Sequence, residues 1–451
     1  MDTFTSSVTS QTFTLTSFDA IVSHINCSFV AFYRNDHDDQ SRFMPADVMQ
    51  ESFYRALVQF PIMAGDLVQR DDGGLEVTVD QHNLNMPNYC ESTADDMHFK
   101  DIKATNYSPE FWPKGLENSG IALAINISHA IGDAVCYNAL ADVWANEMCA
   151  LEAGRIAAEI SFLFDRSIVQ KCLPAERTPL DSTTLALYTQ PNPEAEAFAR
   201  LPPHERHALV LDKIGRGTVR QHSLFRFRTK ELDDLVQQTK EFVPDGIHLS
   251  VSDVLVTVIA KTLAQAHKGI AVASGTDTIE RRQGMHKIDF PCNVRPHLGI
   301  PGNYTGNMLY QILTYNTIEQ AESPTSSQSV AEIAVKIRAG LKAAKAPLIS
   351  ELFDTLEADP TRFTRTMMAT NMFQQTVSIT NHCKGPVFTS DFGYGKPEFM
   401  IMSPPFQMGA ICLMLAKPQC KDMYVTLTET PAILKQICAN KAWMELTERM
   451  Y

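Results

Sequence analysis

The sequence predicts an α/β or α+β protein built from two similar-sized domains. The chain has 451 residues, more than one ordinary core accommodates, so two or three folding units are expected. Strand patterns and helix patterns are mixed in both halves, as in sheets that are covered by helices. Residues 181–218 are rich in proline and charge, which predicts a long crossover between an N-terminal domain at residues 1–180 and a C-terminal domain at residues 219–451.

The first half is predicted to contain three strands and two helices. An apolar, β-branched run predicts the first strand, and the helix that follows is ended by Pro61. A turn leads into the second strand. A further apolar run predicts the third strand, and the second helix follows it after a short loop. In chain order, these elements are expected at residues 25–33, 48–60, 75–79, 120–128 and 134–150.

The second half is predicted to open with a strand and two helices and to end in a helix. Ser250 or Ser252 is suited to be the N-cap of the second of these helices. A segment near residues 375–400 could return to the sheet of the N-terminal domain. The elements of this half are expected at residues 222–228, 229–242, 252–266, 288–293, 306–314, 328–344, 375–380, 409–416, 422–428 and 432–447.

The composition argues against several classes of function. A formal net charge of -13 argues against a sequence-independent nucleic-acid surface, because such a surface needs clustered Lys and Arg. No run of about 18 apolar residues and no secretory leader pattern are found, so we expect a cytoplasmic protein without a membrane partner. The ten cysteines form no C-x-x-C pair, which predicts reduced thiols and no metal. We expect a monomer.

The segment HAIGD at residues 129–133 is the first candidate for chemistry. His129 lies where a predicted strand hands over to a helix, and an imidazole with an ordinary pKa near about 6.5 can take a proton from an alcohol or amine. Asp133 could orient the imidazole, or it could be a structural anion paired with an arginine elsewhere. The spacing alone is weak, since His129 could also be a partly buried histidine at a strand end.

A second motif, DFGYGKP, occupies residues 391–397. Its two glycines, Gly393 and Gly395, flank an aromatic residue, a pattern suited to a tight turn that Pro397 would restrict. The motif carries no nucleophile and no obvious metal ligand. We therefore expect it to have a structural role.

Together the two motifs resemble those of the BAHD acyltransferase family, HxxxD and DFGWGKP, in the same order and at a similar separation. Further segments resemble the same family, so that the likeness covers nearly the whole chain. The chain also looks similar to fungal members such as the trichothecene-type O-acetyltransferases. The further segments are SFD at residues 17–19, FPIMAGDL at 60–67, LSVSDV at 249–254, FPCNVR at 290–295 and YTGN at 304–307.

The resemblance implies a fold of the chloramphenicol acetyltransferase-like type, with two domains that each contain a mixed sheet and flanking helices. It implies acyl-CoA as co-substrate and a small-molecule acceptor, such as a secondary metabolite, that attacks the thioester directly. His129 would be the general base, and Asp133 would form a salt bridge with Arg295 that supports the loop. Asp391, Gly393 and Gly395 would shape a structural loop. Neither a covalent acyl-enzyme nor a metal is implied.

Other site residues are assigned by position. Thr380 is the candidate donor to the oxyanion of the tetrahedral intermediate, with Asn381 as the alternative, because TNH at residues 380–382 stands where the family has Thr/Ser-Ser-Trp. Asn26 falls where family members line the acceptor pocket. Candidates for the CoA phosphates are Ser250, Ser252 and Lys261, the serines because helix N-termini attract phosphate.

The chain departs from the family pattern at three positions. Ala134 replaces the glycine that usually follows the motif aspartate, Tyr394 replaces the central tryptophan of the second motif, and His382 replaces the tryptophan after Thr380. The first two changes are small. The third leaves the shape of the site beside Thr380 open.

Two alternative functions remain at this stage. A condensation domain of peptide synthesis shares the histidine-aspartate spacing but takes acyl groups from carrier proteins, and it normally has a second histidine where this chain has Ser128. A catalytically inactive binding protein would keep the fold without the chemistry, although both His129 and Asp133 are retained here. The sequence leaves the acyl group and the acceptor undefined, with acetyl or another short chain as the simplest expectation.

Overall fold

The computed structural model describes most of the chain. The predicted crossover at residues 181–218 lies almost wholly outside the described residues, so the domain boundaries remain predictions. Among the described residues, no helix has the length and apolar character needed to cross a membrane. The described residues are 2–23, 26–35, 42–91, 99–105, 120–182, 184–185, 221–359, 376–383, 390–402, 411–416 and 422–451.

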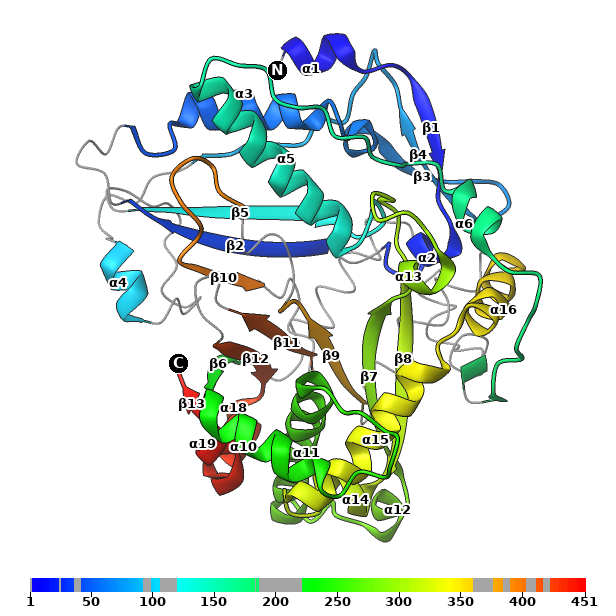
Figure 1. Cartoon of the computed structure of the whole chain (residues 1–451), viewed down its shortest axis with the longest axis vertical. Helices are drawn as coiled ribbons and strands as arrows, with labels where there is room; N and C mark the ends of the chain where they lie inside the picture. The colour runs from blue at the N-terminus through cyan, green and yellow to red at the C-terminus, as the bar shows by residue number, and fades with distance from the viewer. Residues whose placement is uncertain are drawn as a thin grey trace.

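The N-terminal half contains two three-stranded sheets with helices packed beside them (Figure 1). Strands β2 (Asn26–Arg34) and β5 (Gly120–Ser128) pair antiparallel, and helices α3 (Ala46–Leu57) and α5 (Ala134–Glu152) pack together over this pair. The smaller sheet has the order β1-β4-β3. Its strands and the remaining elements of this half are β1 (Gln11–Thr14), β3 (Asp66–Gln69), β4 (Leu75–Val79), α1 (Asp2–Ser7), α2 (Ser17–Ala20), η2 (Pro61–Ala64), α4 (Phe99–Ala104) and α6 (Ser167–Cys172).

The C-terminal half is built on a seven-stranded sheet of order β13-β6-β12-β11-β9-β7-β8. Strand β9 (Thr376–Asn381) is parallel to both of its neighbours, and the other pairs are antiparallel. The other strands are β6 (Gln221–Phe227), β7 (Met285–Asn293), β8 (Leu309–Thr317), β11 (Ile411–Ala416), β12 (Met423–Glu429) and β13 (Thr447–Arg449).

Helices cover one face of this sheet, below it in Figure 1. Helix α11 (Val251–Ala273) is central, and Ser250 caps it through a reciprocal pair of hydrogen bonds with Asp253. Val377 and Ile379 of β9 pack into this helical layer, so the alternating Ser378 and Thr380 face the opposite side. The other helices of the C-terminal half are α10 (Thr229–Lys240), α12 (Ile279–Arg282), α14 (Ile318–Glu322), α15 (Ser327–Ala343), α18 (Pro431–Ala439) and α19 (Lys441–Leu446), together with α13 (Arg295–Leu298) and α16 (Ala346–Glu357), which lie away from this layer (Figure 1).

The two halves are tied together by segments that cross between them. Strand β10 (Phe399–Met402) comes late in the chain but pairs antiparallel with β2 of the N-terminal sheet, and it also contacts β11. A second contact between the halves is made by α16, which packs on α2. Here the backbone N–H of Ser17 donates to Glu357 at 2.7 Å, and the ring of Phe18 packs against that of Phe353. These contacts bring the end of β5 close to the β7–β8 connection.

Two predicted elements differ from those observed. The expected helix at 432–447 is two helices followed by β13, because Asn440 has extended backbone and its side chain caps α19 by accepting from the N–H of Trp443. Strand β8 begins at Leu309 rather than near 306, because the preceding residues Gly306 and Asn307 bond to side chains of the site instead of to a neighbouring strand.

Candidate active site

The HAIGD segment forms the connection between β5 and α5. Ser128 is the last residue of β5, and Asp133 is the N-cap of α5, where its carboxylate accepts from the backbone N–H of Val135 at 3.0 Å. The strand therefore sets the position of His129 from one side, and the helix cap sets the end of the loop from the other.

Side chains distant in sequence bind this loop at three points. The Asn307 amide Nδ2 donates to the carbonyl of His129 at 2.8 Å, and an Arg166 guanidinium nitrogen donates to the carbonyl of Ile131 at 2.6 Å. Arg295 binds Asp133 at the loop's end, with N–O distances of 2.8 and 3.0 Å. Each contact comes from outside the β5–α5 unit, so the loop takes its shape only in the complete fold.

The carboxylate of Asp133 is saturated by donors other than the imidazole. It accepts from both terminal nitrogens of Arg295, from the N–H of Val135, and from the N–H of Met308 at 3.1 Å. Both Asp133 and Arg295 are buried. The structure thus brings the predicted pair together, and it favours a supporting role for Asp133 over a role as the partner of His129.

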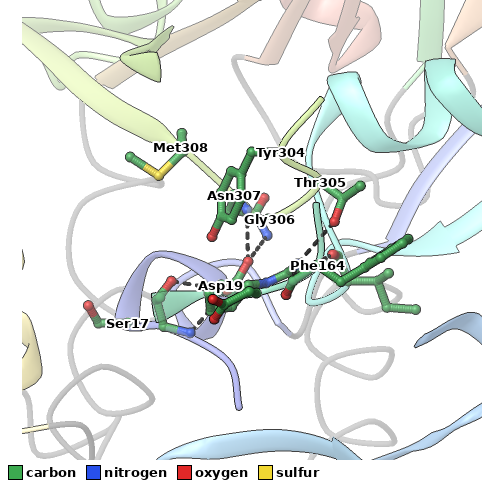
Figure 2. A network of polar contacts seen from close by, with 12 residues as sticks. Ser17, Asp19, Phe164, Tyr304, Thr305, Gly306, Asn307 and Met308 are labelled. Carbon is green, nitrogen blue, oxygen red and sulfur yellow. Dashed lines mark hydrogen bonds and ion pairs between the residues drawn. The ribbon is translucent and has the colours of Figure 1, made fainter. Parts of the chain in front are cut away.

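A second buried carboxylate, Asp19, organises the segment that follows Arg295 (Figure 2). One oxygen accepts from both the backbone N–H of Asn307 at 2.8 Å and its side-chain Nδ2 at 2.9 Å. The other accepts from the backbone and hydroxyl of Thr16 and lies 3.4 Å from Nε of Arg166. Asp19 thereby orients the side-chain amide of Asn307, which binds the carbonyl of His129. It supports the loop indirectly, through Asn307.

Tyr304 lies between the two arginines of the site. The guanidinium of Arg166 is 5.4 Å from the centre of its ring, and that of Arg295 is 5.6 Å away, which are cation–π distances. Arg295 also donates from Nε to the carbonyl of Tyr304 at 3.2 Å. The aromatic ring therefore helps to keep two buried cations in place beside two buried carboxylates.

Sequence reasoning did not assign site roles to Asp19, Arg166 and Asn307. Asp19 and Asn307 fall within the segments SFD and YTGN that carried the family resemblance, so a signal for them was present. Arg166 stands in no such segment. Its role arises from a reach across space to Ile131 and to the hydroxyl of Thr305, at 3.0 Å.

The imidazole of His129 is suited to act as a neutral base. Burial lowers the pKa of His129 below the ordinary value of 6.5, while Asp133, its own backbone and the side chain of Asn307 raise it in part. Nδ1 is buried and has no hydrogen-bond partner of normal geometry among the described residues. The residue as a whole is partly exposed, so Nε2 is the nitrogen that a substrate can reach.

Gly132 allows a close approach within the loop. A Cβ atom here would lie 2.3 Å from the carbonyl oxygen of Thr305 and 2.5 Å from Cβ of Cys136. We expect Gly132→Ala to lower the free energy of unfolding by about 1–3 kcal/mol, since neighbouring backbone must move. The shift of the histidine should lower kcat/KM by about 10²-fold.

Urea unfolding and steady-state kinetics measure the two effects of Gly132→Ala. Gly302→Ala is the matched control, because a Cβ at Gly302 would have no atom within 4 Å. Equal stability and activity of the two variants would contradict the proposed close approach.

The second motif lies against the N-terminal helices. Asp391 accepts from the N–H groups of Gly393 and Gly395 at 2.8 and 2.9 Å, and both glycines have positive φ, of 97° and 95°. Phe392 is buried in the N-terminal core against Trp144 of α5, and Tyr394 hydrogen-bonds Glu152 at the end of that helix. The three predicted residues thus form a turn that attaches this segment to α5.

The strand end after β9 carries the candidate oxyanion donor. Thr380 Oγ1 lies 3.1 Å from Nε2 of His382 and is partly exposed. Asn381 points to the other side of the strand, where Nδ2 donates to Ser252 Oγ at 3.3 Å and Oδ1 accepts from the N–H of Cys383 at 2.9 Å. We therefore correct the assignment of Asn381, which supports the strand end and does not share the face of Thr380.

Asn26 lies close to the HAIGD loop. It begins β2 and is directly opposite Ser128, the residue before His129, in the antiparallel pair. Asn26 is exposed. Its position suits the predicted contact with an acceptor.

The structure changes the predicted CoA contacts. Lys261 is fully buried, its ammonium donates to the carbonyl of Gln320 and to Ser323 Oγ, both at 2.8 Å, and burial lowers its pKa to about 8. Its assignment to a phosphate is corrected, because the ammonium is committed to the α14 segment. Ser252 remains a prediction.

Ser250 is likewise committed to local structure. Its hydroxyl donates to Asp253 at 2.9 Å and accepts from Arg338 at 2.8 Å. Asp253, itself paired with Arg338, already places a negative charge at the positive end of α11. We therefore correct Ser250 from a phosphate contact to a helix cap.

A cavity of about 850 Å³ adjoins the HAIGD loop on the N-terminal side. Ser128, Ala130 and Ile131, which flank His129, form part of its wall. Aliphatic and aromatic side chains, among them Phe53 and Trp144, form much of the remainder. Its size is in the range of small-molecule sites. In the described part of the chain, no cluster of three or more His, Cys, Asp or Glu could hold a metal ion.

The fold and the histidine loop held between the two halves define a two-domain acyltransferase. The model of the Transferase family matches residues 115–441. A hydroxycinnamoyltransferase of Narcissus pseudonarcissus is 22% identical over 404 residues, covering 85% of this chain and 84% of that protein. The chain therefore belongs to the Transferase family of acyl-CoA-dependent acyltransferases, the BAHD family.

Solved structures agree with this fold. TRI101 of F. sporotrichioides, crystallised with coenzyme A and T-2, superposes with a TM-score of 0.76 at 12% identity, covering 98% of this chain and all of that one. Vinorine synthase superposes with a TM-score of 0.60 at 15% identity, covering 97% of this chain and 94% of the other. The chain thus has the two-domain α/β architecture of these acyltransferases.

Proposed function

We propose that this chain transfers an acyl group from acyl-CoA to a hydroxyl or amine of a small-molecule acceptor, with His129 as the general base. Nε2 of His129 takes the acceptor proton as the acceptor oxygen or nitrogen attacks the thioester carbonyl. The tetrahedral intermediate then expels the CoA thiolate, which takes up the proton from His129. Thr380 supplies a hydrogen bond to the oxyanion of that intermediate.

The observation that supports this proposal most is that Asp133 pairs with Arg295 and not with the imidazole of His129. Asp133 is fully engaged by Arg295 and backbone N–H groups, so no carboxylate of the described residues is hydrogen-bonded to the imidazole. A neutral, partly exposed imidazole can accept a proton, and among the described residues no hydroxyl or thiol is hydrogen-bonded to its Nδ1. This arrangement favours direct attack by the acceptor over an acyl-enzyme.

The comparisons suggest which substrates to test. Relatives include rosmarinate synthase and several hydroxycinnamoyltransferases, and TRI101 was crystallised with coenzyme A and the T-2 mycotoxin. We propose acetyl or another short acyl group as donor, with a secondary metabolite as acceptor. The apolar lining of the cavity favours an acceptor that is itself partly apolar.

Thiol release by the purified protein tests the function. Acetyl-, malonyl-, hexanoyl- and hydroxycinnamoyl-CoA are each supplied with and without a panel of alcohols and amines, and products are identified by mass. Acceptor-dependent thiol release with a matching acylated product supports the proposal. No turnover with any pair, despite binding of CoA, would favour the inactive-homologue alternative. Turnover only with acyl groups on a carrier protein would favour the condensation alternative.

The rate should depend on pH through His129. Because the base must be neutral and burial lowers the pKa of His129, kcat/KM should fall with falling pH at a midpoint below 6.5. A pH–rate profile under subsaturating acceptor measures this midpoint. A loss of activity centred well above 6.5 would contradict a buried histidine as the titrating base.

A further inference from the structure

His382 adds a second imidazole to the site, where the resembled family has a tryptophan. Its Nε2 lies 3.1 Å from the hydroxyl oxygen of Thr380, two residues earlier on the same side of the strand end. Asn381, on the opposite side, is held by Ser252 and by the N–H of Cys383. Because these bonds hold Asn381 on one side of the strand end, Thr380 and His382 both lie on the other side, where their side chains meet.

The direction of the Thr380–His382 hydrogen bond decides what the threonine can do. A threonine hydroxyl has one hydrogen and can donate only once. If Nε2 of His382 accepts that hydrogen, nothing remains for a thioester oxygen. If Nε2 carries a proton and donates, the hydroxyl accepts at Oγ1 and its own hydrogen is left for the substrate.

The surroundings keep His382 neutral. Burial lowers the pKa of His382 to about 4, and the neighbouring His129 lowers it as well. A neutral His382 avoids repulsion when His129 becomes positively charged during the reaction, and it has a single N–H to place.

We propose that His382 is a positioning residue that donates from Nε2 to Thr380 Oγ1 and thereby directs the threonine hydroxyl toward the thioester carbonyl oxygen. The inference rests on the proposed function of Thr380 as the oxyanion donor. No bond is broken at His382 itself, and its proton stays on Nε2 throughout. A hydroxyl that accepts one hydrogen bond donates a stronger one, so His382 also increases the strength of the contact to the oxyanion.

The tautomer of His382 can be measured without a substrate. In protein labelled with ¹⁵N-histidine, the ring signals of His382, assigned from their loss in His382→Gln, should show a neutral imidazole protonated at Nε2 between pH 6 and 8. Thr380→Val removes the acceptor and should shift the Nε2–H signal. A His382 that is charged, or that is protonated at Nδ1, would overturn the proposal.

The second test is steady-state kinetics with the acyl-CoA and acceptor that give the highest rate in the thiol-release screen. Thr380→Val should lower kcat by about 10²–10³-fold. His382→Phe, which removes the donor, should lower kcat by about tenfold with both KM values nearly unchanged. His382→Gln, which offers an amide N–H near the same place, should recover most of that loss. In the Thr380→Val background, His382→Phe should have little further effect, because the hydroxyl it directs is gone.

The outcomes separate this inference from the proposed function. Equal losses in His382→Phe and His382→Gln, or a full additional loss in the Thr380→Val background, would show that His382 only packs. Wild-type rates in His382→Phe, in a protein that still needs His129, would sink the inference and leave the function standing. Thermal unfolding of each variant shows whether the fold is retained.

Discussion

Replacement of His129 by alanine is expected to lower kcat by about 10²–10⁴-fold, the usual contribution of a general base. The acceptor then has no group to take its proton at the moment of attack. Both KM values should change little, because the side chain contributes to the transition state more than to binding. The fold should be retained, since the loop is held through the His129 carbonyl, which alanine keeps.

Thiol release and product mass measure the effect of His129→Ala, with thermal unfolding as the check on the fold. His297→Ala is the matched control, because His297 is exposed on α13 and takes no part in the loop. The variant at His297 should keep the wild-type rate. A His129→Ala protein that transfers acyl groups at the wild-type rate would remove His129 from the mechanism.

Replacement of Arg295 by methionine is expected to lower the free energy of unfolding by about 3–5 kcal/mol, because it leaves the Asp133 carboxylate buried without a countercharge. Arg295 also binds the backbone carbonyls of Tyr304 and Gly306, so these acceptors lose a donor as well. Activity should fall with stability, because the Asp133 end of the histidine loop loses its anchor.

Urea unfolding of Arg295→Met, Asp133→Asn and the double variant measures the coupling between the two residues. A buried pair should show an interaction of roughly 1–3 kcal/mol in such a cycle. Arg55→Ala is the control, since its partner Glu51 lies one turn earlier on α3 and both are more than a third exposed, at 37% and 38%. It should change stability by less than about 1 kcal/mol. An Asp133→Asn protein of full stability that has lost only the base function would instead indicate a triad.

Much of the fold was predictable because the apolar pattern of many elements lies within their own length. The predicted strand at 120–128 and the helix from 134 agree with β5 and α5, and of the two predicted N-caps, Ser250 and Ser252, Ser250 is the observed one. The final helix was predicted as one because its apolar spacing continues through Asn440. Only the cap at Asn440 and the pairing of β13 with β6 divide it, and that pairing joins residues far apart in the sequence.

The candidate site likewise contains some residues that the sequence predicted correctly and others whose direction only the structure shows. Sequence reasoning predicted the Asp133–Arg295 pair and the Asp391 turn, which the structure contains, because each lies in a recognisable segment. The roles assigned to His129 and Thr380 stay predictions. Sequence reasoning placed Lys261 and Ser250 on CoA and Asn381 among the donors, since a sequence shows the type of a side chain but not its direction. Burial commits Lys261 to hydrogen bonds with the α14 segment, Asp253 and Arg338 engage the Ser250 hydroxyl at the start of α11, and strand alternation turns Asn381 away.

By itself, the sequence determined the family, the two-domain α/β fold and the histidine at the end of β5, because these follow from motifs and local periodicity. Only the tertiary structure decided how that histidine is held. Asp133 meets an arginine 162 residues away, and Asn307 meets Asp19 across 288 residues. Buried charges require partners wherever the fold brings them, so packing between the two halves decided that Asp133 pairs with Arg295 rather than with the imidazole of His129.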